Sequence, residues 1–239
     1  MIRKLLIVFA SGLVLSILLL SAAWVVGGGE MVNRLRHESG DWGWHGHDSR
    51  GYHGPQATRS LIFDARKVLR IDVPASVHFT RGDTVRMTVE GPGRLIERLR
   101  WQDGRLSLGG HAPWFVGPID ITITAPQIPG LELHGASDVE LIGLDQRSFT
   151  VDAFGAVDLE ANGKVRTLSV NSHGAGDLDL ERVEASDATV RVAGVGDVDI
   201  SATGKVDAAI SGAGDITLHR KPADLASRVS GFGEIRHDY

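Results

Sequence analysis

The sequence predicts an all-β protein whose main part is a single-chain parallel β-helix, preceded by an irregular N-terminal β cap and one N-terminal apolar helix. A heptad of the form GxGDφxφ, where φ is apolar, recurs every 18–20 residues, and a fixed period of this length is typical of a repeat architecture. Glycine is abundant, with 30 of 239 residues, and aromatic residues are few, as expected for a turn-dense β protein. The chain has no cysteine, which excludes disulfides and thiolate chemistry.

The repeat is long enough to close one coil. Each heptad is followed by a turn and a second short alternating stretch, so one repeat supplies two strands and two corners. A strand of four or five residues spans roughly 15 Å, and successive coils would stack as parallel strands about 4.8 Å apart. The general preference for right-handed crossovers predicts a right-handed coil of 19–20 residues. The heptads begin at Gly135, Gly155, Gly174, Gly194, Gly212 and Gly231.

Alternation within the heptad predicts the core. The apolar fifth and seventh positions should point inward, and the polar position between them should face solvent. The expected inward residues are Val139, Leu141, Leu159, Ala161, Leu178, Leu180, Val198, Ile200, Ile216 and Leu218. The expected outward residues are Glu140, Glu160, Asp179, Asp199 and Thr217.

The glycines and acidic residues of the heptad should form a structural ladder at one corner. Glycine permits positive φ and close approach of neighbouring coils. The acidic side chain can accept a hydrogen bond from a backbone N–H group of its own corner, as in an Asx-turn. This corner ladder consists of Gly135, Asp138, Gly155, Asp158, Gly174, Gly176, Asp177, Gly194, Gly196, Asp197, Gly212, Gly214, Asp215, Gly231, Gly233 and Glu234.

Stacking one carboxylate per coil has an electrostatic cost. Two unit charges about 4.8 Å apart repel by roughly 0.9 kcal/mol in water. Hydrogen bonds, raised pKa values or bound cations such as calcium could offset this repulsion. The period differs from the nine-residue repeat of calcium-binding β-rolls, which favours turn-capping carboxylates over a metal site. We therefore predict no catalytic, cofactor or metal residues in the ladder.

The N-terminal residues 1–27 read as a membrane anchor or a signal peptide. Arg3 and Lys4 precede an uncharged stretch, of which residues 5–26 are long enough to span a membrane. A cleaved signal remains the alternative. In either case the positive N-terminal end places the rest of the chain in the periplasm or outside the cell.

Residues 28–59 lack hydrophobic periodicity and predict a flexible Gly/His/Trp linker. Its histidines raise the hypothesis of a transition-metal site, because neutral imidazole is a common metal ligand. The spacing matches no defined site, so a solvated tether is the simpler interpretation. The histidines are His37, His45, His47 and His53, with Asp41 and Asp48 nearby.

Residues 60–128 predict the non-repeating β cap, and residues 129–239 the repetitive β-helix. Strand-like alternation separated by turn residues occurs at 68–73, 76–80, 84–90, 105–108 and 119–124. The stretch "GRLIERLR" at 93–100 predicts a short helical turn.

The opening strands "LRIDVPASVHFTRGDTVRMTVEG" (69–91), and "LELHGASDVEL" (131–141) leading into the ladder, carry a family resemblance. Over residues 68–239 the chain resembles the putative auto-transporter adhesin head GIN domain family. The resemblance implies a parallel β-helix with an irregular β cap, exported or tethered to a membrane. It also implies an adhesin-like role.

Charge and motifs narrow the function. Residues 131–239 carry 10 Lys/Arg against 19 Asp/Glu, which excludes a basic nucleic-acid-binding face. The chain contains no GxSxG, HExxH or phosphate-loop motif, and its repeated carboxylates are equivalent. We predict a non-catalytic envelope protein without a cofactor, displaying a binding or adhesion module to an envelope glycan or protein. A structural or regulatory envelope component that acts through a protein partner is the alternative, and a polysaccharide-active enzyme the second.

Overall fold

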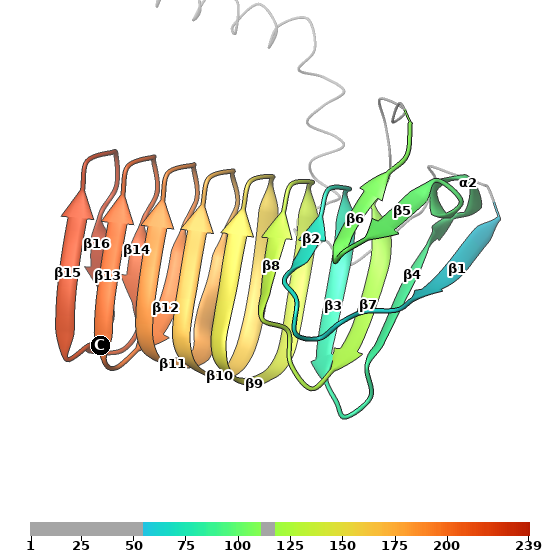
Figure 1. The fold of residues 1–239 in the computed structure, drawn as a ribbon. Helices are drawn as coiled ribbons and strands as arrows, with labels where there is room; N and C mark the ends of the chain where they lie inside the picture. Colours follow the sequence, from blue (N-terminus) through green and yellow to red (C-terminus); the bar gives the residue numbers. More distant parts are fainter. Residues whose placement is uncertain (1–54, 111–117) are drawn as a thin grey trace, which may run out of the picture. The chain divides into compact units, whose positions relative to one another are not determined.

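The computed structural model describes residues 55–110 and 118–239, whose strands stack into a solenoid (Figure 1). Each coil of the repeat region rises through one strand, turns at a glycine corner and descends through another. The strands of this region are β8 (Gly130–Leu133), β9 (Ser137–Ala153), β10 (Val157–Ser172), β11 (Leu178–Val192), β12 (Val198–Ala202), β13 (Lys205–Ile210), β14 (Ile216–Leu218), β15 (Asp224–Val229) and β16 (Ile235–His237).

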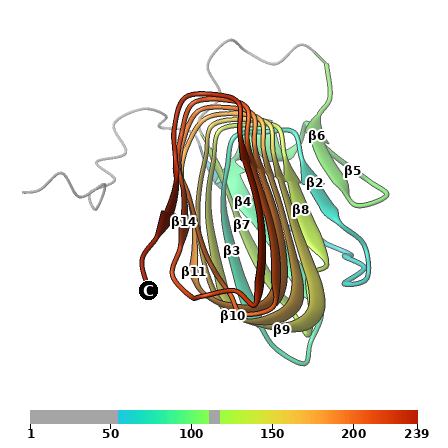
Figure 2. The ribbon, with the colours of Figure 1, turned by 90° about the vertical axis from the view of Figure 1, so that its left-hand side faces the viewer.

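Successive coils pair in parallel and place heptad over heptad. Asp158 lies beside Asp138, Leu178 beside Leu159, and Val198 beside Leu178. Viewed along its axis, the solenoid is a flattened ring with two long sides (Figure 2). In Figure 2 the chain ascends on the right, crosses the top and descends on the left as it advances toward the viewer, which is a right-handed sense. The predicted parallel β-helix is confirmed.

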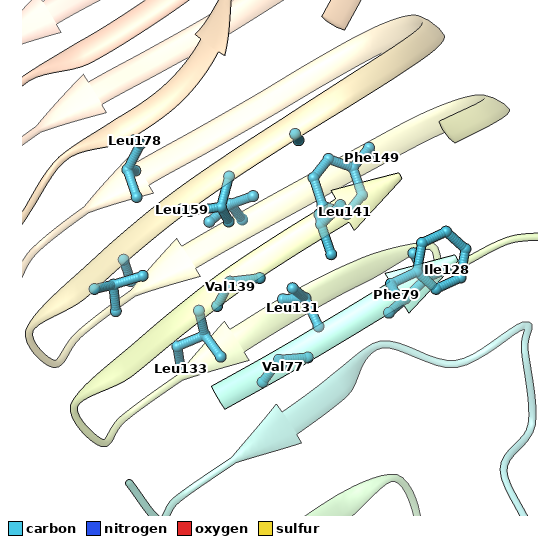
Figure 3. Close-up of a cluster of buried hydrophobic side chains, with 14 of the residues drawn as sticks. Val77, Phe79, Ile128, Leu131, Leu133, Val139, Leu141, Phe149, Leu159 and Leu178 are labelled. Atoms are coloured by element: carbon cyan, nitrogen blue, oxygen red, sulfur yellow. The ribbon is translucent and has the colours of Figure 1, made fainter. Parts of the chain in front are cut away.

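The core lies between the two long sides and consists of the side chains predicted to point inward. The ten heptad residues named above, from Val139 to Leu218, are each at most 3% exposed. Figure 3 shows several of them in register, with Val139 and Leu141 between Val77 and Phe79 on one side and Leu159 on the other. Each coil thus covers the apolar residues of the previous one, which is how a solenoid gains stability.

The first part of the cap continues the solenoid out of sequence order. β2 (Leu69–Ile71) pairs in parallel with β8, and β3 (Ala75–Arg81) pairs in parallel with β9. β6 (Arg105–Leu108) and β7 (Ile119–Ala125) add another parallel level beyond them. The cap is therefore more regular than the sequence predicted.

Antiparallel strands close the N-terminal end of the stack. β4 (Arg86–Pro92) pairs with β7, β1 (Gln56–Leu61) with β4, and β5 (Leu99–Gln102) with β6. β1 begins at Gln56, so the last residues of the predicted linker (28–59) belong to this strand. The helical turn is only α2 (Gly93–Ile96), because Leu99 is buried in β5 opposite Leu108.

The predicted anchor or signal (1–27), its membrane segment (5–26) and the linker histidines lie outside the described residues. Among residues 55–110 and 118–239, no helix has the length and apolar character needed to cross a membrane.

Candidate functional site

One long side of the solenoid carries a line of carboxylates, here called the acidic row. Strand register aligns Glu90 with Asp120, and Ser76 stands between Asp120 and Asp138. From Asp138 onward every coil adds one carboxylate. The acidic row is Glu90, Asp120, Asp138, Asp158, Asp177, Asp197, Asp215 and Glu234.

The heptad pattern predicted the last six members of the acidic row but not the first two, Glu90 and Asp120. Glu90 and Asp120 belong to no heptad, and β4 runs antiparallel to β7. Only strand pairing brings these two residues into line, so no local signal could have identified them.

Hydrogen bonds between coils support the acidic row. The Oδ1 atom of Asp177 accepts the backbone N–H of Asp197 at 3.0 Å, and Asp197 accepts that of Asp215 at 2.8 Å. The same contact joins Asp158 to Asp177 at 3.4 Å and Asp215 to Glu234 at 2.8 Å. The expected Asx-turn was wrong in its direction, because these four carboxylates cap the next coil rather than their own corner. Stacking at the strand spacing places that next N–H within reach.

A second acidic line lies two residues further along the same strands, at Glu140, Glu160, Asp179 and Asp199. Cationic groups accompany several of its members. His78 lies 3.3 Å from Glu140, Arg182 pairs with Glu160, and His219 lies 2.8 Å from Asp199.

The middle of the acidic row lacks such partners. At its end, Arg236 pairs with Asp215 at 2.7 Å and with Glu234. Within the described ranges no ion pair involves Asp138, Asp158, Asp177 or Asp197. The same ranges contain no group of three or more His, Cys, Asp or Glu residues arranged to hold a metal ion. The acidic row is therefore a solvated, negatively charged stripe supported by hydrogen bonds.

The two glycine positions of the heptad require glycine for different structural reasons. A Cβ atom on Gly194 would lie 1.9 Å from the carbonyl oxygen of Gly174 in the coil below, so the first glycine is required by close approach alone. The second glycine also needs positive φ, as at Gly176 with φ +117°. The first glycines do not have the positive φ expected of them from the sequence. Ser137 and Val157 occupy the second-glycine position in the first two coils, where a strand already begins.

Substitutions at Asp177 can separate the effect of charge repulsion on stability from the effect of the hydrogen bond between coils. In Asp177→Asn the amide oxygen can still accept the N–H of Asp197, so we expect unchanged or higher stability, with any gain shrinking at high salt. In Asp177→Ala that acceptor is lost, and we expect a loss of about 1 kcal/mol. Urea unfolding of both variants at low and high salt measures this. Equal destabilisation by Asn and Ala would show that the charge itself is needed.

Three rings stack along the edge next to the glycine corner. His134 and Phe154 lie 4.6 Å apart between centroids, and Phe154 and His173 lie 5.0 Å apart, both nearly parallel. The central ring has both faces covered by its neighbours, so it offers a sugar only its edge. The two histidines pack on opposite faces of Phe154 beside the corner.

His219 links its own coil to three others. Its ring lies 2.8 Å from Asp199, 3.6 Å from Asp238 and 3.8 Å from Glu181, and its side chain is 17% exposed. Burial alone would lower the pKa of His219, but the hydrogen bond to Asp199 and the three negative charges outweigh it and raise the pKa above its ordinary value.

This raised pKa predicts a pH-dependent contribution to stability. The protonated ring stabilises the fold fully below the ordinary histidine pKa of about 6.5, and this contribution disappears as pH rises through the higher folded-state pKa. We expect His219→Gln to lower the melting temperature more at pH 5.5 than at pH 8.5. Val195→Ala, an exposed corner substitution that changes no titratable group, is the control and should show a pH-independent difference. A His219→Gln effect that does not vary with pH would contradict the assignment.

The cap contains a hollow of about 230 Å³. The indole N–H of Trp101 donates to the carbonyl of Ile62 beside it, at 2.9 Å. Typical ligand pockets measure about 300–1,000 Å³, so this hollow is small. It is lined by Ile62, Phe63, Asp64, Lys67, Trp101, Asp103 and Gly104.

Comparison with known proteins agrees with the architecture. A search of curated proteins returns no relative. A putative adhesin from Bacteroides fragilis shares the fold, with a TM-score of 0.58 and 20% identity, over 77% of this chain and 97% of that chain. A putative lipid binding protein from Parabacteroides distasonis aligns with a TM-score of 0.45 and 17% identity, over 77% and 97%. The model of the family described as putative auto-transporter adhesin, head GIN domain, matches residues 67–222. The chain therefore belongs to this adhesin-like family.

Proposed function

We propose that this chain is a non-catalytic binding module of the cell envelope that displays its β-helix outside the cytoplasm. The observation that carries the proposal is the pair of long sides, on which outward side chains repeat at the strand spacing (Figure 2). A repeating surface suits a repeating or extended ligand, such as an envelope glycan. Family membership and the apolar N-terminal sequence support the adhesion role and the location.

The two long sides differ in chemistry. One carries the acidic row. The other aligns hydroxyl side chains across three successive coils, followed by Asp207 and Ala226 in the next two. This hydroxyl row is Thr150, Ser169 and Thr189. Hydroxyl groups both donate and accept hydrogen bonds, so they suit a neutral sugar chain better than a row of carboxylates does.

The carboxyl groups support a non-catalytic role. An acid/base pair needs two carboxyls in unlike environments, with one pKa raised. Where a carboxyl pKa is shifted among the described residues, it is lowered: at Asp64 by Arg66, and at Glu184 by Lys164. At Asp72 burial acts to raise the pKa, but hydrogen bonds from Arg105 and Arg70 outweigh it. The members in the middle of the acidic row all have the same surroundings, which suits scaffolding.

Co-sedimentation with purified peptidoglycan sacculi tests the proposal. We expect the detergent-solubilised full chain to sediment with the sacculi, and the triple variant Thr150→Ala, Ser169→Ala, Thr189→Ala to bind at least about tenfold more weakly. The triple variant Asp158→Asn, Asp177→Asn, Asp197→Asn is the matched control on the other long side. Absence of sedimentation would refute glycan binding. Release of reducing ends from the sacculi would refute the non-catalytic assignment.

The second candidate is a structural or regulatory envelope component that acts through a protein partner. The observation in its favour is the last coil, whose strands have unpaired outer edges within the described residues. An unpaired edge is a template for another strand.

A further inference from the structure

The C-terminal end of the solenoid exposes groups that every earlier coil buries. Among the described strands, β15 pairs only with β13, and β16 pairs only with β14. The outer edges of β15 and β16 are therefore open (Figure 1). Val229 is 45% exposed, whereas Ile210, directly below it, is 1% exposed. The end coil therefore presents both apolar surface and free backbone hydrogen-bonding groups.

The backbone restricts how another strand can add to β15. The N–H groups of Asp224 and Ser230 donate toward β13, to Gly204 at 3.2 Å and Ile210 at 2.8 Å. Alternate residues of a strand direct their N–H and C=O groups to opposite sides. Leu225, Ser227 and Val229 therefore direct theirs to the open edge, and an antiparallel partner must place its own outward-directed residues opposite them.

The charges on β15 select one such register. Asp224 and Arg228 lie on the outer surface of the strand, two residues on either side of Ala226, and neither has an ion pair within residues 55–110 and 118–239. When two β15 strands pair antiparallel about Ala226, Asp224 stands opposite Arg228 of the partner subunit, and the reciprocal pair forms as well. Leu225 then stands opposite Ser227 of the partner subunit, with the backbone groups of both directed at each other.

Other registers lose these ion pairs. A shift of two residues in either direction places one of the two charges opposite Ala226 of the partner subunit. A shift of one residue sets each outward-directed residue opposite a residue whose N–H and C=O groups are directed inward, so the strands cannot form their hydrogen bonds. The charge pattern and the backbone pattern therefore agree on a single symmetric arrangement.

We propose that two copies of this chain associate end to end through β15, related by a two-fold axis at Ala226. A two-fold contact is self-complementary, as the reciprocal ion pairs require. The association covers the open edge and extends the β-sheet across the two copies. It goes beyond the binding function proposed above and does not depend on it, because neither long side takes part.

The absence of cysteine from the sequence makes cross-linking a direct test. Directly opposed residues of an antiparallel pair have Cα atoms about 4.5–5.5 Å apart, within the range of about 4.4–6.8 Å for a disulfide. We expect Ala226→Cys in the full chain to form a disulfide-linked dimer under mild oxidation. Val195→Cys, on an exposed corner away from the end coil, is the matched control. Cross-linking of Ala226→Cys no faster than Val195→Cys would overturn the proposal.

Charge reversal in the Ala226→Cys background tests the register. Arg228→Asp turns both ion pairs into like-charge contacts, so we expect cross-linking to slow by at least about tenfold. Adding Asp224→Arg restores the opposite charges and should restore the rate. Cross-linking that is insensitive to Arg228→Asp, or that the double reversal fails to restore, would overturn the assigned arrangement. Peptidoglycan binding is measured separately, so failure of one proposal leaves the other intact.

Discussion

Gly194→Ala is expected to lower the free energy of unfolding by more than about 4 kcal/mol, an effect larger than most single substitutions produce. The added Cβ atom would lie 1.9 Å from the carbonyl oxygen of Gly174 and 2.8 Å from the carbonyl carbon of His173. Both contacts are with backbone, so no side chain can move to relieve them. Separating the coils would also break the hydrogen bond from Val195 N–H to Gly174, at 2.9 Å.

Val195→Ala is the control for Gly194→Ala. Val195 is the next residue on the same corner and is 60% exposed, so its truncation should change stability by less than about 0.5 kcal/mol. Thermal and urea unfolding followed by circular dichroism compare the two variants. A Gly194→Ala protein that melts within a few degrees of the wild type would show that neighbouring coils can separate at the corner, contrary to the structure.

Phe149→Ala is expected to cost about 3–5 kcal/mol, because it leaves a large cavity in the core. Phe149 lies in the core (Figure 3) and is 0% exposed. Strand register places it beside Leu168 of the next coil. The coils above and below are held by their own strand pairing, so they cannot easily collapse into the space. Urea unfolding measures the loss.

Phe154→Ala removes the same side chain five residues later and is the matched control. Phe154 is 44% exposed and contacts its neighbours through ring stacking, which is worth about 0.5–1.5 kcal/mol per pair. We therefore expect a clearly smaller loss than for Phe149→Ala. Equal losses would mean that the stack of rings, and not the interior, dominates stability in this coil.

The heptad shows how far sequence reasoning reaches in this chain. Leu178 and Leu180 could be placed in the core because a strand alternates its side chains, whatever the neighbouring coil contains. Asp177 could be placed on a ladder because the period fixes which residues stack. The partner of its carboxylate could not be predicted, since the N–H of Asp197 and a backbone group of its own corner are equally plausible on local grounds.

The pairing of strands in the cap could not be predicted from the sequence. β2 and β3 have ordinary strand alternation, but nothing local indicates that they stack on β8 and β9, which follow them by some 60 residues. The predicted helical turn at 93–100 overlaps the first two residues of β5, Leu99 and Arg100, which are strand in the structure. The identity of β5 depends on pairing with β6, which is a tertiary contact.

The sequence by itself determined the repeat, the coil length, the inward residues and the acidic character of one corner, because each follows from a period that adjacent residues carry. The tertiary structure alone decided the extension of the acidic row to Glu90 and Asp120, the direction of its hydrogen bonds, the grouping around His219 and the open edge of β15. These features depend on which strands become neighbours. Which strands become neighbours depends on the apolar surface that whole coils bury together. That burial involves many residues far apart in the sequence, so no short stretch of sequence predicts it.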